Sequence, residues 1–441
     1  MTATPDAPTR EQAPDPQKQG RIRGVLAALG GLLAPVARFF SPVARFLAPV
    51  WRVFAKLRTL LTRNLRQSGI MIAFVLIVLV FSLVAKNFLS PGNLTNIVLQ
   101  YSYILILAIG MVIVIIAGHI DLSVGSVVAL AGAVSATVVI KEGMPWYVGV
   151  LAALVVGVLV GVWQGFWVAF VGIPAFIVTL AGMLLFRGLT FMVLNSISLS
   201  PFGGTYYRIA NGFQNGLFGG RGYDVFTLVI FGIAVAGYAF NSWRGRRARL
   251  RYQQTVEGIP WFVTKIVAIG AVVMWFAFQL AQSRGLPNVL VLLGVLIIIY
   301  TLVTQRSVFG RHVYAIGGNL NAAQLSGVKV RKVNFWIFVN IGALAGIAGV
   351  VYSSRMNAAQ PGAGNMFELD AIAACFIGGA AVTGGVGKVT GAMIGGLIMA
   401  VMINGMQLMG IETAVQQVVK GLVLLIAVAF DLYNKRRAET R

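Results

Sequence analysis

The sequence predicts an all-α, polytopic membrane protein with about 10–12 transmembrane helices. The 441 residues are 58% hydrophobic and only 11% charged, and the mean hydropathy is +0.85. Apolar runs of roughly 18 residues or more, the length of helix that crosses a bilayer, recur along most of the chain. We therefore expect most of the chain to be embedded in a membrane.

Positive charge dominates the polar residues, with 35 Lys and Arg against 12 Asp and Glu, a net charge of +23. In a soluble domain this excess would suggest nucleic acid, but here the basic residues lie mostly between or outside the apolar runs. Anionic lipid headgroups and membrane topology explain them better, so lipid is an expected partner and nucleic acid is not. The single cysteine, Cys375, excludes an intrachain disulfide. The two histidines, His119 and His312, are far apart in the sequence, so no metal site is expected.

The amino-terminal region is unlike the rest of the chain. Residues 1–20 are polar and Pro-rich and are expected to be a disordered cytoplasmic tail. Between residues 34 and 54, units containing one Pro and one Arg repeat every seven residues, which is too costly for a span and weakens a helix. We expect residues 21–66 to form a basic amphipathic segment on the membrane surface. A helix that binds a partner protein is the alternative.

Twelve apolar segments follow, which define a membrane domain over residues 67–434 with a short cytoplasmic tail at 435–441. The expected segments are 69–86, 98–117, 123–140, 147–171, 174–194, 223–242, 261–280, 288–304, 333–352, 369–383, 389–409 and 414–432. Segment 369–383 is short, so a re-entrant or broken helix is expected near residues 369–391.

Basic flanks predict which side of the membrane each end occupies. The clusters lie before the first segment (Arg58, Arg63, Arg66), at 243–252, within 306–332, and after the last segment (Lys435, Arg436, Arg437). A count of twelve spans puts all four clusters on one side, which the positive-inside rule makes cytoplasmic. Both termini are therefore expected in the cytoplasm.

The longest polar interval of the carboxyl-terminal half runs from Ser307 to Lys332. Within it Asn319 is a suitable N-cap, residues 320–326 can form about two helical turns, and Gly327 supplies a left-handed stop. So short a helix needs a surface to lie against. Ala322 and Ala323 would give it a flat face for the backbone of a partner, although an ordinary capped loop helix is the alternative.

Ionisable groups close to or inside the apolar runs are costly and usually functional. Asp121 or Ser123 can cap the helix that follows, while Gly125 permits close backbone approach. Arg187 lies near the middle of the fifth segment and needs a carboxylate, carbonyls or water, with Asp121 and Glu368 as candidate partners. A capped interfacial turn and an Arg side chain that extends to the interface are the simpler readings.

Residues 367–396 combine two carboxylates with many glycines. Glu368 and Asp370 are two residues apart, so on a helix they face different directions and charge its N-terminus instead of sharing a proton. The glycines that follow allow a break and then close helix contact, as a gate requires; they are Gly378, Gly379, Gly384 and Gly385. A static glycine-packed interface is the alternative.

Residues 385–390, GVGKVT, superficially suggest a phosphate-binding loop. Such a loop needs Gly five positions before Gly387, where Val382 stands, and Ser or Thr directly after Lys388, where Val389 stands. We expect no ATP hydrolysis and no catalytic residue in this chain.

Several of these motifs together resemble one family, the permeases of monosaccharide ABC importers of the ribose, xylose and galactose group. Residues 118–126, GHIDLSVGS, resemble the signature Gly-Gly-Ile-Asp-Leu-Ser-Val-Gly-Ser, from which only His119 departs. The resemblance continues in the family's order from about residue 70 to 432, through the stretches 174–180, 187–188, 368–374 and the glycines up to 391. Asn321 to Gly327 is similar to the Glu-Ala-Ala-x-x-x-Gly loop of ABC importer permeases, with Asn321 in place of Glu.

The resemblance implies a passive permease, closest to the larger xylose-type members, with a cytoplasmic coupling helix in the 307–332 loop. It further implies an ATPase subunit that carries ATP and Mg, an extracytoplasmic sugar-binding protein, a second permease copy and location in a bacterial-type inner membrane. No cofactor is expected in this chain. Three alternatives stay open: an intramembrane enzyme that uses Asp121, Glu368 or Asp370, a proton-coupled secondary transporter, and an ABC permease for another small polar solute such as a branched-chain amino acid.

Overall fold

A computed structural model describes residues 65–220 and 222–439. The chain divides into two units between Ser68 and Gly69, and the account that follows concerns the second unit. The predicted tail at 1–20, and all but the last two residues of the surface segment predicted at 21–66, lie outside the described residues.

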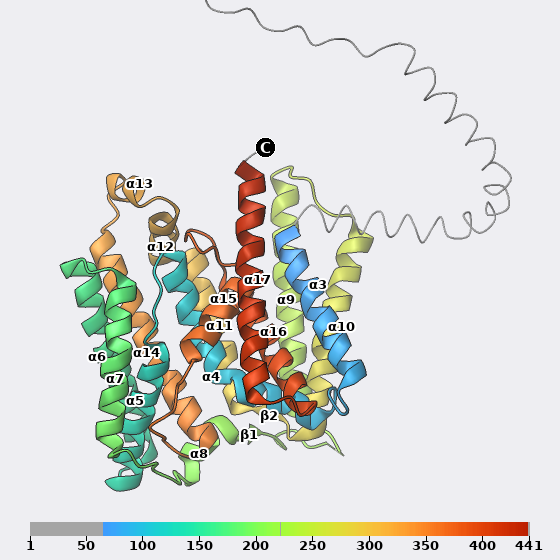
Figure 1. Ribbon diagram of the computed structural model, residues 1–441. Helices are drawn as coiled ribbons and strands as arrows, with labels where there is room; N and C mark the ends of the chain where they lie inside the picture. Colours follow the sequence, from blue (N-terminus) through green and yellow to red (C-terminus); the bar gives the residue numbers. More distant parts are fainter. Residues whose placement is uncertain (1–64, 221, 440–441) are drawn as a thin grey trace, which may run out of the picture. The chain divides into compact units, whose positions relative to one another are not determined.

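The described residues are mainly helical (Figure 1). The helices are α3 (Leu65–Val84), α4 (Pro91–Ile116), α5 (Val124–Ala136), α6 (Trp146–Phe166), α7 (Ala175–Leu194), α8 (Gly204–Asn211), α9 (Val225–Arg251), α10 (Ile259–Ser283), α11 (Asn288–Arg306), α12 (Val308–Gly318), α13 (Leu320–Leu325), α14 (Val330–Met356), α15 (Phe367–Ile377), α16 (Val389–Leu408) and α17 (Thr413–Glu439). Short π-helical turns, Thr137–Lys141 and Trp167–Val171, continue α5 and α6. Two short strands, β1 (Phe213–Gln214) and β2 (Leu286–Pro287), pair antiparallel.

The predicted all-α membrane fold is confirmed. Within the described ranges, nine helices are long and apolar enough to cross a membrane, and α3 and α17 contribute two shorter apolar stretches. With α15, these helices account for all twelve expected segments. The segment expected at 369–383 is indeed broken, since α15 ends at Ile377 and α16 begins only at Val389.

Some predicted boundaries were wrong. Helix α4 begins at Pro91, seven residues before the expected start, because Ser90 caps it by accepting a hydrogen bond from the Asn93 N–H and Pro91 fits the first turn. Helix α9 continues through the Arg-rich stretch to Arg251, and α17 continues to Glu439, where a tail was expected. Apolar character marks where a helix meets lipid, but not where it ends in water.

Asp224 caps the start of α9, just outside the membrane-spanning segment. Its carboxylate accepts hydrogen bonds from the Thr227 N–H at 2.9 Å, the Thr227 hydroxyl at 2.6 Å and the Gly216 N–H at 2.9 Å. Burial raises the pKa of the Asp224 carboxyl, but these hydrogen bonds lower the pKa by more, so the net pKa lies below its usual range.

The centre of the bundle is α4, whose apolar window is 89% buried. Around it pack α14, α15, α16, α11 and α10. Helix α14 also packs closely along α6, and small residues make that approach possible: a Cβ atom on Gly157 would lie 2.3 Å from the Gly342 carbonyl oxygen.

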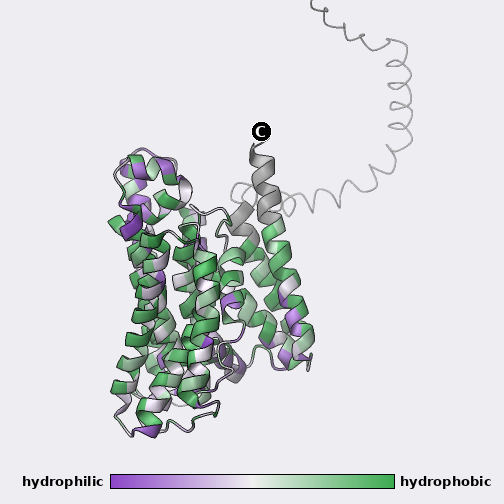
Figure 2. Ribbon diagram, turned by 60° about the vertical axis from the view of Figure 1, so that its left-hand side comes forward, coloured by the Kyte–Doolittle hydropathy of each residue, from purple (hydrophilic) through white to green (hydrophobic). Residues whose placement is uncertain are grey.

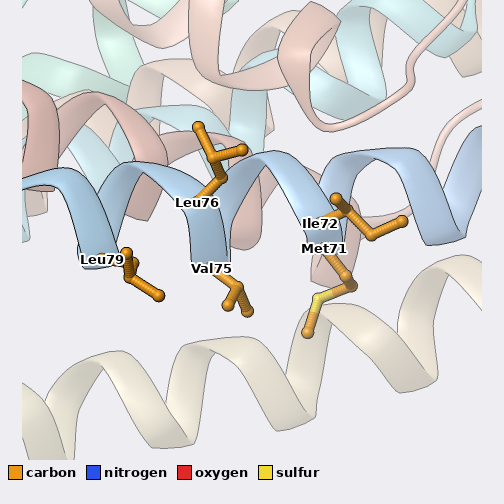
Figure 3. A pocket seen from close by; sticks show the side chains of 5 residues that line it. All are labelled: Met71, Ile72, Val75, Leu76 and Leu79. Carbon is orange, nitrogen blue, oxygen red and sulfur yellow. The ribbon is translucent and has the colours of Figure 1, made fainter. Parts of the chain in front are cut away.

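The periphery is suited to lipid. The apolar windows of α9 and α10 are only 6% and 11% buried, and Figure 2 shows hydrophobic residues along most of the helices. A shallow hollow on α3 has the same character, because its lining consists of exposed apolar side chains (Figure 3): Met71, Ile72, Val75, Leu76 and Leu79. Without a polar group in that lining, the hollow is suited to acyl chains and not to a sugar.

Two ends of the bundle can be distinguished in Figure 1. The α13 end contains α12, α13 and the carboxyl end of α17, and the strand end contains α8, β1 and β2. Helices α8 and α12 were not predicted. Both are short and largely polar or glycine-rich, so neither has the long apolar run on which the expected segments were based.

Candidate functional site

Helices α5 and α15 begin partway along the bundle instead of at one of its ends (Figure 1). Helix α15 has only 11 residues, about 16 Å at 1.5 Å per residue. The first turn of α5 touches the loop that precedes α15: a Cβ atom on Gly125 would lie 2.2 Å from the Gly364 carbonyl oxygen, and one on Gly364 would lie 1.9 Å from the Gly125 carbonyl oxygen. Both positions therefore require glycine, as was predicted for Gly125.

Asp121 lies in a buried polar network at the start of α5. Its carboxylate accepts hydrogen bonds from the Ser123 N–H at 2.8 Å and the Ser123 hydroxyl at 2.7 Å, and the Gln164 side-chain amide donates to that hydroxyl. Asp121 thus stabilises the turn into α5, whereas Ser123, the other candidate cap, makes no capping bond. All three side chains are covered by protein in this structure.

Glu368 faces the same region from α15. It is buried, and its Oε2 atom has no hydrogen-bond partner among the described residues. Arg187, half-buried on α7, and Asp121 both interact electrostatically with Glu368 without direct contact. The structure therefore brings together the three ionisable groups that the sequence had indicated as candidate partners, at the point where α5 and α15 begin.

Asp370 faces another direction, as the two-residue spacing predicted. Its carboxylate oxygens lie 2.9 Å and 3.0 Å from the Nζ atom of Lys420 on α17. Sequence reasoning missed Lys420, although a lone lysine inside the last apolar segment was a usable signal. This ion pair connects α15, which precedes the break, to α17.

Glycine makes the break between α15 and α16 possible. Gly379, Gly384 and Gly385 all have positive φ, at 86°, 80° and 72°. A Cβ atom on Gly378 would lie 2.3 Å from the Gly391 carbonyl oxygen, so the chain folds tightly back onto the start of α16. The predicted break at these four glycines is present, and we refer to residues 378–388 as the hinge loop.

The hinge loop contacts the end of α4 and the end of α12. The Gly385 N–H donates to the Ile116 carbonyl oxygen at 2.8 Å, and the Tyr314 hydroxyl donates to the Gly387 carbonyl oxygen at 2.7 Å. A Cβ atom on Gly317 would lie only 1.7 Å from the Ile116 carbonyl oxygen. Sequence reasoning missed Gly317 and Tyr314; the Gly317-Gly318 doublet directly before the predicted N-cap was the available signal.

Helix α13 follows α12 without a long loop. The Asn319 side chain accepts a hydrogen bond from the Ala322 N–H at 3.0 Å, and Gly327 has φ of 81°, so the predicted cap and stop are both confirmed. Ala323 is buried within this chain, which corrects the idea of a flat two-alanine face. The outward surface instead includes Asn321, Ala322, Leu320 at 45% exposed and Leu325 at 91% exposed.

The arrangement combines buried charges with helix breaks. Within residues 65–220 and 222–439, no three His, Cys, Asp or Glu side chains gather in a way that could hold a metal ion. Buried charges at broken helices, glycine hinges and a short solvent-facing helix connected to them are features of a membrane transport protein. The fold and the site thus define a permease.

Comparison with known proteins gives the family. The chain belongs to the family described as branched-chain amino acid transport system / permease component, whose model matches residues 93–428. It is 41% identical over 375 residues to the xylose transport system permease protein XylH of Haemophilus influenzae, which covers 85% of this chain and 98% of that protein. The Escherichia coli XylH is 39% identical over 85% of this chain and 94% of that protein. The ribose import permease protein RbsC of E. coli is 32% identical over 85% of this chain and 95% of that protein. No solved structure matches the chain.

Proposed function

We propose that this chain is the transmembrane permease subunit of an ABC importer that brings xylose or a related monosaccharide into the cell. The relatives named for xylose are more similar to it than the relatives named for ribose, at 41% against 32% identity. The XylH and RbsC relatives are named for sugars and not for an amino acid, so a permease for branched-chain amino acids is not favoured.

The observation that carries the mechanism is the continuous contact from α13 to the broken helix. Helix α13 presents Leu325 outward, α12 joins it to Gly317, and Gly317 lies against both Ile116 and the hinge loop. A force applied to α13 would therefore be passed directly to the connection between α15 and α16. Packed helices move as units between discrete arrangements. Movement of α15 and α16 could therefore open or close a pathway for the substrate.

The energy source lies outside this chain. We propose that a separate ATPase subunit, which carries ATP and Mg, docks on α13, and that an extracytoplasmic binding protein delivers the sugar at the strand end. The α13 end and both termini are then cytoplasmic, in agreement with the basic flanks. Two copies of the permease would form the complete conduit, and no cofactor is needed in either.

Reconstitution tests this proposal. The full complex of permease, ATPase and binding protein in proteoliposomes should take up labelled xylose only with ATP, and the permease alone should neither hydrolyse ATP nor transport. Excess leucine should not compete. Sugar uptake by the lone chain under a proton gradient, or leucine uptake by the complex, would refute the assignment.

The docking surface can be tested separately. Leu325→Glu places a charge on the exposed tip of α13 and should abolish copurification with the ATPase. Leu217→Glu is the matched control, because Leu217 is a leucine that is 61% exposed in a loop at the other end of the bundle. If both variants bind the ATPase as the unmodified chain does, α13 is not the docking helix.

A further inference from the structure

Three aromatic rings from three different helices meet near the strand end. The Tyr103 ring on α4 lies 5.0 Å from that of Tyr352 on α14 and 4.8 Å from that of Phe367, the first residue of α15. The Tyr352 and Phe367 rings are 5.1 Å apart, edge to face. We call these three residues the aromatic triad. All three residues are half-buried.

Neither tyrosine hydroxyl of the triad has a hydrogen-bond partner among the described residues. Two other tyrosines in the bundle have bonded hydroxyls, since that of Tyr300 accepts from the Asn340 side-chain amide and that of Tyr314 donates to a backbone carbonyl. A tyrosine used only for packing inside a membrane protein normally has its hydroxyl satisfied. Two free hydroxyls on adjacent rings therefore leave donors and acceptors for something else.

Charged and amide groups adjoin the triad. Arg355, one turn after Tyr352, donates to the side-chain oxygens of Asn211 at 2.7 Å and Asn96 at 2.9 Å. These two bonds leave other guanidinium N–H groups for a ligand. Both Arg355 and Asp370 interact electrostatically with the Tyr103 side chain. Asn211 ends α8, which places this group of residues at the strand end.

We propose that the aromatic triad and Arg355 form a monosaccharide-binding subsite of the permease. Ring faces carry negative charge density and suit the C–H groups of a sugar ring, while free phenol hydroxyls and a guanidinium suit its hydroxyls. This proposal rests on the proposed function. The subsite would be the first place inside the membrane where the sugar contacts the permease. Phe367 begins α15 and the hinge loop follows its other end. If α15 moved with the hinge loop, Phe367 would separate from Tyr103 and Tyr352 and the sugar would be released.

Cysteine labelling tests whether the subsite is open to water. The only native cysteine of this chain, Cys375, is completely buried, so a cysteine introduced elsewhere is the only accessible one in the permease. In the full complex, Tyr352→Cys and Tyr103→Cys should react with a membrane-impermeant maleimide from the extracytoplasmic side. Millimolar xylose should slow the reaction several-fold, whereas mannitol should not. Leu217→Cys, on an exposed loop, should react equally with or without sugar.

Transport tests whether the hydroxyls contact the sugar. Tyr352→Phe keeps the ring and should lower xylose uptake about two- to tenfold, the effect of one hydrogen bond. The variant should also lose discrimination between xylose and one of its monodeoxy analogues, while ATP hydrolysis stays within twofold of the unmodified complex. Tyr300→Phe is the control, since it removes a hydroxyl outside the triad and should leave sugar discrimination unchanged.

The outcomes separate the two proposals. If the unmodified complex takes up no monosaccharide, the proposed function fails. If the complex transports xylose but the triad cysteines do not label, or label without protection by sugar, the subsite is refuted and the function stands. If Tyr352→Phe lowers ATP hydrolysis and thermal stability together with uptake, the triad serves only in packing and the subsite is likewise refuted.

Discussion

Replacing Lys420 with methionine should destabilise the protein by about 3 kcal/mol, because it leaves the Asp370 carboxylate without its cation. Removal of one member of a buried ion pair typically costs about 3–5 kcal/mol. The lower end applies here, since the Lys420 side chain is 25% exposed and that of Asp370 is 12% exposed. Such a change lowers the ratio of folded to unfolded protein about 100-fold.

Unfolding of the purified protein in mixed micelles, followed by tryptophan fluorescence, measures this change. The double variant Asp370→Asn with Lys420→Met should recover most of the loss, because it leaves no uncompensated charge. Lys265→Met is the matched control: Lys265 lies 3.7 Å from Glu257 with about half of each side chain exposed, and such pairs contribute about 0–1 kcal/mol. Equal effects of the two lysine variants, or a double variant as unstable as the sum of the single changes, would refute the reasoning.

Three further predictions concern the ends of helices. Asn319→Ala removes the cap of α13, so it should cost about 1 kcal/mol and weaken ATPase binding measurably in a pull-down assay. Gly317→Ala places a Cβ atom against the Ile116 carbonyl oxygen, so uptake should fall at least tenfold while the ATPase still binds; normal uptake would mean that this contact is not needed. Asp224→Ala should cost about 1 kcal/mol at neutral pH. Because the folded pKa of Asp224 is lowered, its contribution is complete above about pH 4 and disappears as the pH falls through that lowered value, so unmodified and variant proteins should become equally stable in acid.

Sequence reasoning could predict much of the fold because lipid imposes a simple rule. A helix must be apolar along the part that meets acyl chains, so the segments other than the short one at 369–383 had a clear signal. Helix α12 had no such signal, since its residues include Arg311 and His312 among glycines. Its position depends on contacts with the hinge loop, which a single sequence does not reveal.

The candidate site divides in the same way. Asp121, Arg187 and Glu368 were found because an ionisable group in an apolar run is costly wherever it lies. Gly317 and the tyrosines of the aromatic triad were not found, because glycine and tyrosine are common in membrane helices and gain their importance only from their neighbours. The sequence left Asp121 and Ser123 as alternative caps, and only the structure shows that the Asp121 carboxylate accepts the hydrogen bonds of this turn.

The burial of α4 bears on how the protein is assembled. This helix is the second membrane segment to be synthesised, yet its neighbours α10, α11, α14, α15 and α16 are all made later. Lipid must therefore occupy its surface during translation and be displaced as each later segment arrives. A nascent chain that stops before Val330 has α10 and α11 but lacks α14, α15 and α16, so lipid still covers the sides of α4 that these three helices later occupy. Faults in biogenesis would therefore be decided late, in the final quarter of translation.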